Sequence, residues 1–177
     1  MQIKNLFKRN WFAILYFNFK MLPFRQAVRL PFDFYGKIKF QSLKGKVIIN
    51  TTVSRGCFQF GFAQSEIFAG APIIISVDGA LILKGKPFCL GSGSLLEIKN
   101  GATLEAGDDV LIAPRSKVIV KKHIQMGSHV HTSWEIQIMD SNFHYTRNVT
   151  TGEIAPIDKH VIIGNNVWIG NRVTINK

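Results

Sequence analysis

The stretch HVIIGNNVWIGNRVTINK, residues 160–177, decides the fold of this chain. Val161, Val167 and Val173 recur at intervals of six, and a glycine followed by asparagine repeats at the same interval between them. A period of six fits neither an α-helix nor a plain meander of hairpins. It fits a short strand of about three or four residues followed by a tight turn. The stretch therefore predicts a solenoid built from short strands.

Earlier aliphatic residues follow the same period, with a slip of two residues around Pro114 and Arg115. Three strand-and-turn units would close a triangular coil of about eighteen residues, of which Val118 to Ile136 is one step. No single coil can bury its apolar face alone, so stacking of coils supplies the stability. We therefore predict an all-β parallel β-helix over 47–177. Its inward-facing aliphatic positions include Ile98, Leu104, Val110, Val118, Ile124, Val130 and Ile136.

The net charge of +11 is concentrated at the N-terminus. Residues 1–46 carry ten Lys and Arg against one acid, Asp33, whereas the remaining residues carry twelve bases and ten acids. This distribution gives no basic groove across the predicted solenoid, so nucleic acid is not an expected partner. Cys57 and Cys89 form neither a disulfide framework nor a pair with metal-ligand spacing, and we expect two buried thiols.

The segment 1–46 is aromatic as well as basic, and we assign it to an N-terminal arm or cap of helical and extended structure. Its apolar run, Trp11–Phe19, is far shorter than the roughly 20 residues of a membrane-spanning helix. No small-residue cleavage site follows the run, as a signal peptide would require. Two interpretations stay open and are compatible. The segment covers the first layer of the solenoid, or residues 1–30 contact a membrane surface peripherally.

The six-residue period over 95–177, with the run VIIGNNVWIGNRVTI, resembles the hexapeptide-repeat acyltransferases of the left-handed β-helix fold. It is most similar to the bacterial sugar O-acetyltransferases of the maltose and galactoside acetyltransferase kind and their capsule-cluster relatives. The N-terminal YFNFKMLPFRQAVRLPF resembles the leader of the polysaccharide-modifying branch. The left-handed sense of the coil comes from this resemblance alone, because general topology favours right-handed crossovers.

The resemblance implies an acetyl-CoA-dependent O-acetyltransferase that acts on a sugar hydroxyl of a surface polysaccharide or its precursor. It also implies a homotrimer whose sites are shared between two subunits, without a metal. A nucleotide sugar or an amine remains open as the acceptor. The expected location is cytoplasmic, at the inner face of the cell membrane if the basic leader binds there.

The period breaks after Ile136, and the polar excursion 140–160 is a natural place for function. His144, in DSNFHY, matches the family's catalytic histidine at the mouth of an extended loop. A histidine there can accept the proton of an attacking hydroxyl. From the residues alone, a loop histidine with only a local hydrogen bond is the commoner case, and the resemblance favours catalysis. Asp140 is the candidate that would orient the imidazole, as other acyl-transfer sites require.

Further candidates flank the excursion. Glu135 is the other nearby carboxylate, and relatives often carry an acid where Asn142 stands here. Trp134 and Glu135 are the predicted substrate-binding residues, since aromatic faces stack on sugar rings; packing of the Trp134 ring is the competing interpretation. Trp168 follows an inward Val and should therefore point outward. The resemblance places it along the pantetheine arm of acetyl-CoA, with subunit contact as the alternative.

Two further expectations concern metal binding and the C-terminus. His123 and His129 stand one repeat apart and should point away from each other, which disfavours a zinc site that would include His131. Residues 161–177 form almost one complete coil with an uncovered edge. We therefore predict a chain truncated at its C-terminus with an incomplete coenzyme pocket. The alternative function is a non-catalytic solenoid scaffold or an inactive truncated acetyltransferase.

Overall fold

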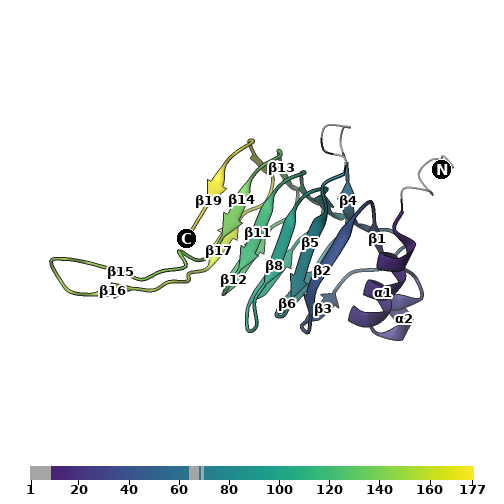
Figure 1. Ribbon diagram of the computed structural model, residues 1–177, viewed down its shortest axis with the longest axis horizontal. Coiled ribbons are helices and arrows are strands. Elements are labelled where there is room, and N and C mark those ends of the chain that lie inside the picture. The colour runs from purple at the N-terminus through teal and green to yellow at the C-terminus, as the bar shows by residue number, and fades with distance from the viewer. Residues whose placement is uncertain (1–8, 64–67, 69) are drawn as a thin grey trace.

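The computed structural model describes residues 9–63, 68 and 70–177. Residues 1–8 of the predicted arm, and of the proposed membrane-contacting segment, lie outside this part of the chain. Strands of three parallel sheets follow one another in strict rotation along the sequence, so that each sheet receives one strand per coil. Figure 1 shows the coils stacked side by side along the longest axis of the molecule. The predicted parallel β-helix is therefore confirmed.

The three sheets make the three sides of the solenoid. The first sheet contains β1 (Phe32–Phe34), β4 (Phe58–Phe62), β7 (Phe88–Gly91), β10 (Val110–Ile112), β13 (Val130–Thr132) and β18 (Val167–Ile169). The second sheet contains β2 (Ile38–Leu43), β5 (Ile73–Val77), β8 (Leu95–Ile98), β11 (Lys117–Val120), β14 (Gln137–Met139) and β19 (Thr174–Ile175). The third sheet contains β3 (Lys46–Ile49), β6 (Ala80–Leu83), β9 (Thr103–Ala106), β12 (His123–Met126) and β17 (Val161–Ile163).

The core lies inside this prism and follows the predicted period. All seven aliphatic residues from Ile98 to Ile136 that the period selects are fully buried. Within the strands, buried side chains alternate with partly exposed ones, as in β12 and β13, because successive residues of a strand point to opposite faces. In the last coil Val161 is buried, whereas Val173 is exposed.

The coil is longer than the predicted eighteen residues. Val118 pairs with Ile138, twenty residues later, and not with Ile136. Val110 likewise pairs with Val130, at the same distance along the chain. The two extra residues lie at the corner between the first and second sheets, where the sequence showed a slip at Pro114 and Arg115. That slip is a regular feature of the corner and recurs in the next coil.

The solenoid also begins earlier than predicted. β1 and β2 lie within the segment 1–46, yet β1 pairs in parallel with β4, and β2 pairs in parallel with β5. The first coil therefore starts at Phe32. Its inward positions on the first sheet are the fully buried Phe32 and Phe34, and they pair with Phe58 and Phe60 on β4 of the next coil, which are also fully buried. A search for an aliphatic period misses this coil because phenylalanine fills the inward positions.

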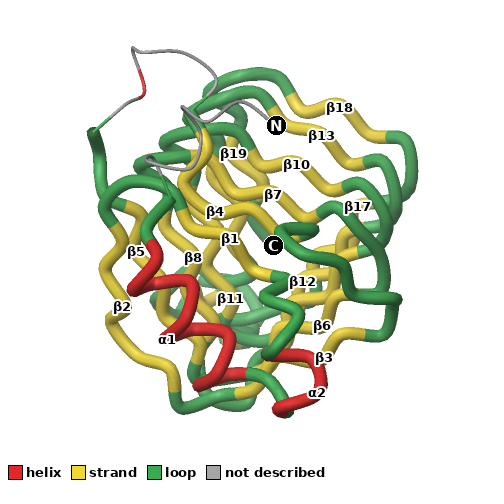
Figure 2. Tube along the Cα trace, turned by 90° about the vertical axis from the view of Figure 1, so that its right-hand side faces the viewer, coloured by secondary structure: helices red, strands yellow, loops and turns green. Residues whose placement is uncertain are grey.

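Two helices, α1 (Trp11–Met21) and α2 (Phe24–Ala27), lie across the N-terminal end of the prism (Figure 2). The Phe17 ring packs edge-on against Phe32, with centroids 4.9 Å apart. The buried Asn18 amide donates to the Phe32 carbonyl at 2.9 Å, and its oxygen accepts from the Phe32 N–H at 3.1 Å. Helix α1 thus covers the aromatic layer and satisfies backbone groups of the edge strand β1.

Candidate active site

The excursion predicted at 140–160 is a hairpin arm. Strand β14 ends at Met139 and β17 begins at Val161, so the arm occupies one corner between the second and third sheets. Within it, β15 (Thr146–Arg147) pairs antiparallel with β16 (Ile154–Ala155). Figure 1 shows the arm projecting away from the stacked coils, at the end of the molecule opposite to α1. Both strands of the arm are exposed.

The base of the arm is closed by backbone hydrogen bonds. Lys159 N–H donates to the Asp140 carbonyl at 3.0 Å, and Asn142 N–H donates to the Ile157 carbonyl at 3.1 Å. A further antiparallel bridge joins Ser141 to Asp158. These contacts return the chain to the solenoid next to the point where it left. The arm is therefore an insertion that leaves the coil path intact.

The Asp140 side chain anchors this base and does not orient a histidine. Its carboxylate is fully buried and accepts backbone N–H groups of three successive residues of the coil below. The distances are 2.7 Å from Lys121, 2.8 Å from Lys122 and 2.7 Å from His123. Among the described residues, no hydrogen bond or ion pair joins Asp140 to His144. The predicted orienting role therefore has no support within one chain, because the turn below already occupies both carboxylate oxygens.

His144 lies just beyond this anchored base. Phe143 has a left-handed backbone with φ of +63°. Its N–H donates to Ser141 Oγ at 3.1 Å, and the ammonium of Lys121 lies 4.4 Å from the centre of its ring. These contacts fix the residue that precedes His144. The His144 side chain is exposed, and within the described part of the chain it makes no hydrogen bond or ion pair. The imidazole is therefore accessible, and no carboxylate among the described residues orients it.

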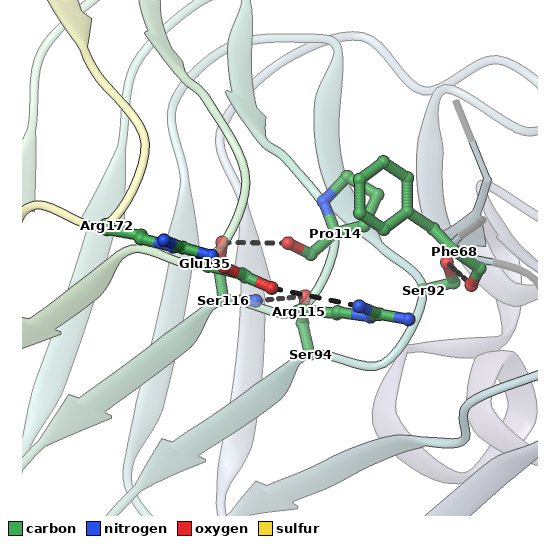
Figure 3. Close-up of polar contacts among 8 residues, drawn as sticks. All are labelled: Phe68, Ser92, Ser94, Pro114, Arg115, Ser116, Glu135 and Arg172. Carbon is green, nitrogen blue, oxygen red and sulfur yellow. Dashed lines mark hydrogen bonds and ion pairs between the residues drawn. The ribbon is translucent and has the colours of Figure 1, made fainter. Parts of the chain in front are cut away.

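Glu135 belongs to a ladder of charged side chains at a different corner, between the first and second sheets (Figure 3). Its carboxylate accepts from Arg172 Nε at 3.0 Å and lies 3.7 Å from Arg115 Nη1. All three residues have left-handed backbones, with φ between +58° and +61°, at equivalent positions of successive coils. The repeated turn therefore stacks a base, an acid and a base along the outside of the prism.

Trp134 lies at the same corner as this ladder and is 42% exposed. Its ring contacts that of Phe68, with centroids 5.7 Å apart, and the Arg115 guanidinium lies 5.3 Å from the centre of the Phe68 ring. The Ser92 hydroxyl donates a hydrogen bond to the Phe68 carbonyl at 2.7 Å (Figure 3). An exposed aromatic face beside guanidinium donors is a surface that can bind a sugar ring and its hydroxyl or acidic groups. Trp134 and Glu135, neighbours in the sequence and both predicted as substrate-binding residues, thus share this corner with Arg115 and Phe68.

Trp168 lies on the outer face of the first sheet and is 70% exposed, which confirms its predicted outward direction. It pairs in register with His131 on the neighbouring strand β13. His131 Nε2 lies 3.0 Å from Asp109 Oδ2, and His129 Nδ1 lies 3.3 Å from the same oxygen. The hydrogen bond with His129 is the main cause that holds the pKa of the Asp109 carboxyl below its usual value.

His123, the third histidine considered for a zinc site, lies on the third sheet and not beside Asp109. Its Nε2 lies 3.2 Å from Glu105 Oε1 on the third sheet, and its ring packs edge-on against His160 with centroids 5.0 Å apart. His123 therefore contacts a different carboxylate from that of His129 and His131. In the part of the chain that the structure describes, no group of three or more His, Cys, Asp or Glu side chains is arranged to hold a metal ion.

The predicted site residues thus occupy three separate places on one chain. His144 lies on the hairpin arm, Trp134 and Glu135 lie at the charged corner, and Trp168 lies on the first sheet. No described hydrogen bond, ion pair or ring contact joins any two of these places. Sequence reasoning missed Arg115 and Arg172, because their position beside Glu135 becomes visible only once the coil length and the insertion are known.

Comparison of the chain with protein-family models, with curated proteins and with solved structures gave no significant match. The resemblance to hexapeptide-repeat acyltransferases therefore rests on the sequence pattern. The fold rests on the three parallel sheets.

Proposed function

We propose that the chain is an acetyl-CoA-dependent O-acetyltransferase that acts on a sugar hydroxyl of a surface polysaccharide or its precursor. The observation that carries this proposal is the exposed imidazole of His144 on an arm that interrupts an otherwise regular solenoid. The site is assembled from parts that a single chain holds apart, so we include a homotrimer in the proposal. In it, the arm of one subunit reaches the sheet surface of its neighbour.

The chemistry needs a base, because a sugar hydroxyl is a poor nucleophile until its proton is leaving. A ring nitrogen of His144 accepts that proton while the hydroxyl oxygen forms a bond to the acetyl carbon. Acetyl-CoA, when bound, supplies the acetyl group as a thioester. The carbon–sulfur bond breaks, and His144 returns the proton to the departing sulfur. The imidazole ends the reaction neutral, so atoms and charge balance without a metal.

The residues around Trp168 fit the narrow pantetheine arm of the coenzyme. The indole is exposed on a flat sheet face, and its register partner His131 adds a polar group beside it. An exposed aromatic ring with a polar neighbour can contact a chain of methylenes and amides, and in the proposed trimer a neighbouring subunit would supply the opposite wall. Trp134 and the ladder of Arg115, Glu135 and Arg172 would then receive the acceptor. Guanidinium groups favour an acidic sugar over a neutral one.

The first test is the release of free CoA from acetyl-CoA in the presence of mixed mono- and oligosaccharides, measured by chromatography. Substitution His144→Ala should lower the rate by about 100-fold or more, the usual contribution of a positioned base. His160→Ala is the matched control, because His160 is also exposed and lies at the end of the same excursion. No CoA release from the unsubstituted chain would favour the scaffold over the enzyme, and equal loss in both variants would contradict the role of His144.

The shared site is tested by complementation. Chains carrying His144→Ala are co-expressed with chains carrying Trp168→Ala, and mixed assemblies are purified through two different tags. Mixed trimers should regain part of the activity, because some interfaces then combine an intact His144 with an intact Trp168. Light scattering after size exclusion gives the oligomeric state. A monomer with full activity would refute the trimer while leaving the chemistry in place.

A further inference from the structure

The helix at the N-terminal end is apolar on both of its sides. One side of α1 is buried against the solenoid through Ala13, Ile14, Phe17 and Met21. The other side also carries large apolar residues, and α2 continues them. We name these exposed residues the outer apolar face: Phe12, Leu15, Phe19, Phe24 and Val28. A surface helix ordinarily has polar residues opposite its buried stripe, so a second apolar stripe marks a binding surface.

The exposure of this face is large. Phe12 is 79% exposed and Phe24 is 73% exposed. The Phe19 and Phe24 rings lie 6.2 Å apart, so the face continues from α1 onto α2. Figure 2 shows both helices lying across the end of the prism, where neither belongs to the sheets. Covering this face therefore requires no rearrangement of the solenoid.

Cations lie on and beside the outer apolar face, and neither α1 nor α2 contains an acidic residue. Lys20, Arg25 and Arg29 are exposed on or beside the same two helices. Between residues 9 and 56 the sequence contains a single acid, Asp33. Asp33 is buried and lies 2.8 Å from the Arg9 guanidinium, so it contributes no negative charge to the surface. The surface thus combines aromatic residues with uncompensated positive charge.

From these observations we propose that the outer apolar face of α1 and α2 docks on an anionic phospholipid bilayer. Aromatic and basic residues together are what an interfacial helix uses, with the rings at the boundary of the acyl chains and the cations at the lipid phosphates. Helix α1 has eleven residues and would lie in the membrane surface. Among the described residues, no helix is long and apolar enough to cross a bilayer.

A second copy of the chain is a less suitable occupant. A symmetric contact through this face would bring Lys20, Arg25 and Arg29 of one copy towards the same cations of the other, and like charges at a contact are unfavourable. A bilayer with anionic headgroups has the complementary charge. Docking at this end also leaves the hairpin arm directed away from the membrane, because the two features lie at opposite ends of the molecule (Figure 1).

The test is co-sedimentation of the full chain with vesicles of phosphatidylcholine alone and with vesicles that also contain phosphatidylglycerol. We expect binding to the anionic vesicles, reduced by added salt. Arg25→Glu with Arg29→Glu should weaken this binding by roughly fivefold or more for each residue changed. Phe12→Ala with Phe24→Ala should weaken it by about tenfold or more, since less apolar surface is buried. Deletion of α1 is not a suitable test of vesicle binding, because its buried side covers the core of the solenoid and the protein could unfold.

Matched controls test whether vesicle binding depends on this surface or on exposed apolar side chains and positive charge anywhere on the protein. Val149→Ala with Ile154→Ala removes exposed apolar side chains from the hairpin arm, and Lys117→Glu reverses an exposed charge on β11. Both should leave vesicle binding unchanged. Absent binding to anionic vesicles, or equal losses in the controls, would overturn the proposal. So would a Phe12→Ala, Phe24→Ala variant that binds vesicles normally but changes its oligomeric state, since the face would then be a contact between chains.

Discussion

The same corner of the prism is built in two different ways in consecutive coils. Between β11 and β12 the corner consists of two residues, Lys121 and Lys122. One coil later, between β14 and β17, it consists of the whole arm 140–160. Yet β12 and β17 pair in regular register, Ile124 with Val161. The comparison shows that strand pairing determines where a corner begins and ends, whereas the number of residues within the corner can vary.

The two versions of the corner also depend on each other. The tight turn exposes three successive N–H groups towards the coil above, and the first residue of the arm, Asp140, accepts all three. The arm is in turn closed at its base by Lys159 and Ile157. Because the entropic cost of closing a loop grows only slowly with its length, the arm can lengthen and carry function without disturbing the coils.

The largest effect is expected from Asp140→Ala. This substitution leaves three backbone donors of the tight turn without their acceptor, and we expect the free energy of unfolding to fall by about 3–5 kcal/mol. Denaturant unfolding followed by circular dichroism measures it. Glu153→Ala, on the exposed part of the arm, is the control and should change stability by less than about 0.5 kcal/mol. Similar losses in both would show that the turn does not depend on Asp140.

A smaller effect on stability is expected when the arm is shortened. Replacing residues 143–156 by Gly-Gly keeps Asp140, Asn142 and Ile157 and converts the arm into a two-residue hairpin. Because the deleted residues are exposed, we expect the free energy of unfolding to change by less than about 1 kcal/mol. CoA release should be lost together with His144. Unfolding of this variant under native conditions would show that the arm is needed for the fold.

An effect confined to alkaline pH is expected in the regular strands with which both corners are compared. Cys89, on β7, is buried, and this burial raises the pKa of its thiol to about 11. The protonated thiol is thus favoured in the folded state, so stability should be unaffected below about pH 9 and should fall as the pH rises towards 11. Unfolding curves of the protein and of Cys89→Ala over this range measure the difference. Cys57 is partly exposed, so the expected burial of both thiols is correct only for Cys89. At pH 8, a thiol reagent should therefore modify Cys57 well before Cys89; the opposite order would contradict the burial.

Much of the fold could be predicted because side-chain direction is a local property. The interval between Val118 and Ile124, or the place of Trp168 after Val167, shows which residues point inward and which point outward. The predicted coil length of eighteen residues was wrong because the two extra residues lie at the corner that contains Glu135, where they do not alter the alternation of side chains within any strand. The first coil was missed because Phe32 and Phe34 replace the aliphatic residues that define the period.

The sequence by itself determined the stacked strands, the inward residues, the outward Trp168 and the place where the period breaks, since each depends on spacing along the chain. Only the tertiary structure decided which groups meet across coils. In the folded chain Asp140 accepts hydrogen bonds from the turn at 121–123, and Glu135 pairs with Arg115 and Arg172. His144 is exposed, and no carboxylate among the described residues contacts it. The physical reason is register: strands of neighbouring coils pair residues that are twenty or more positions apart in the sequence. A shift of two residues therefore changes every partner while leaving the pattern of buried positions almost the same.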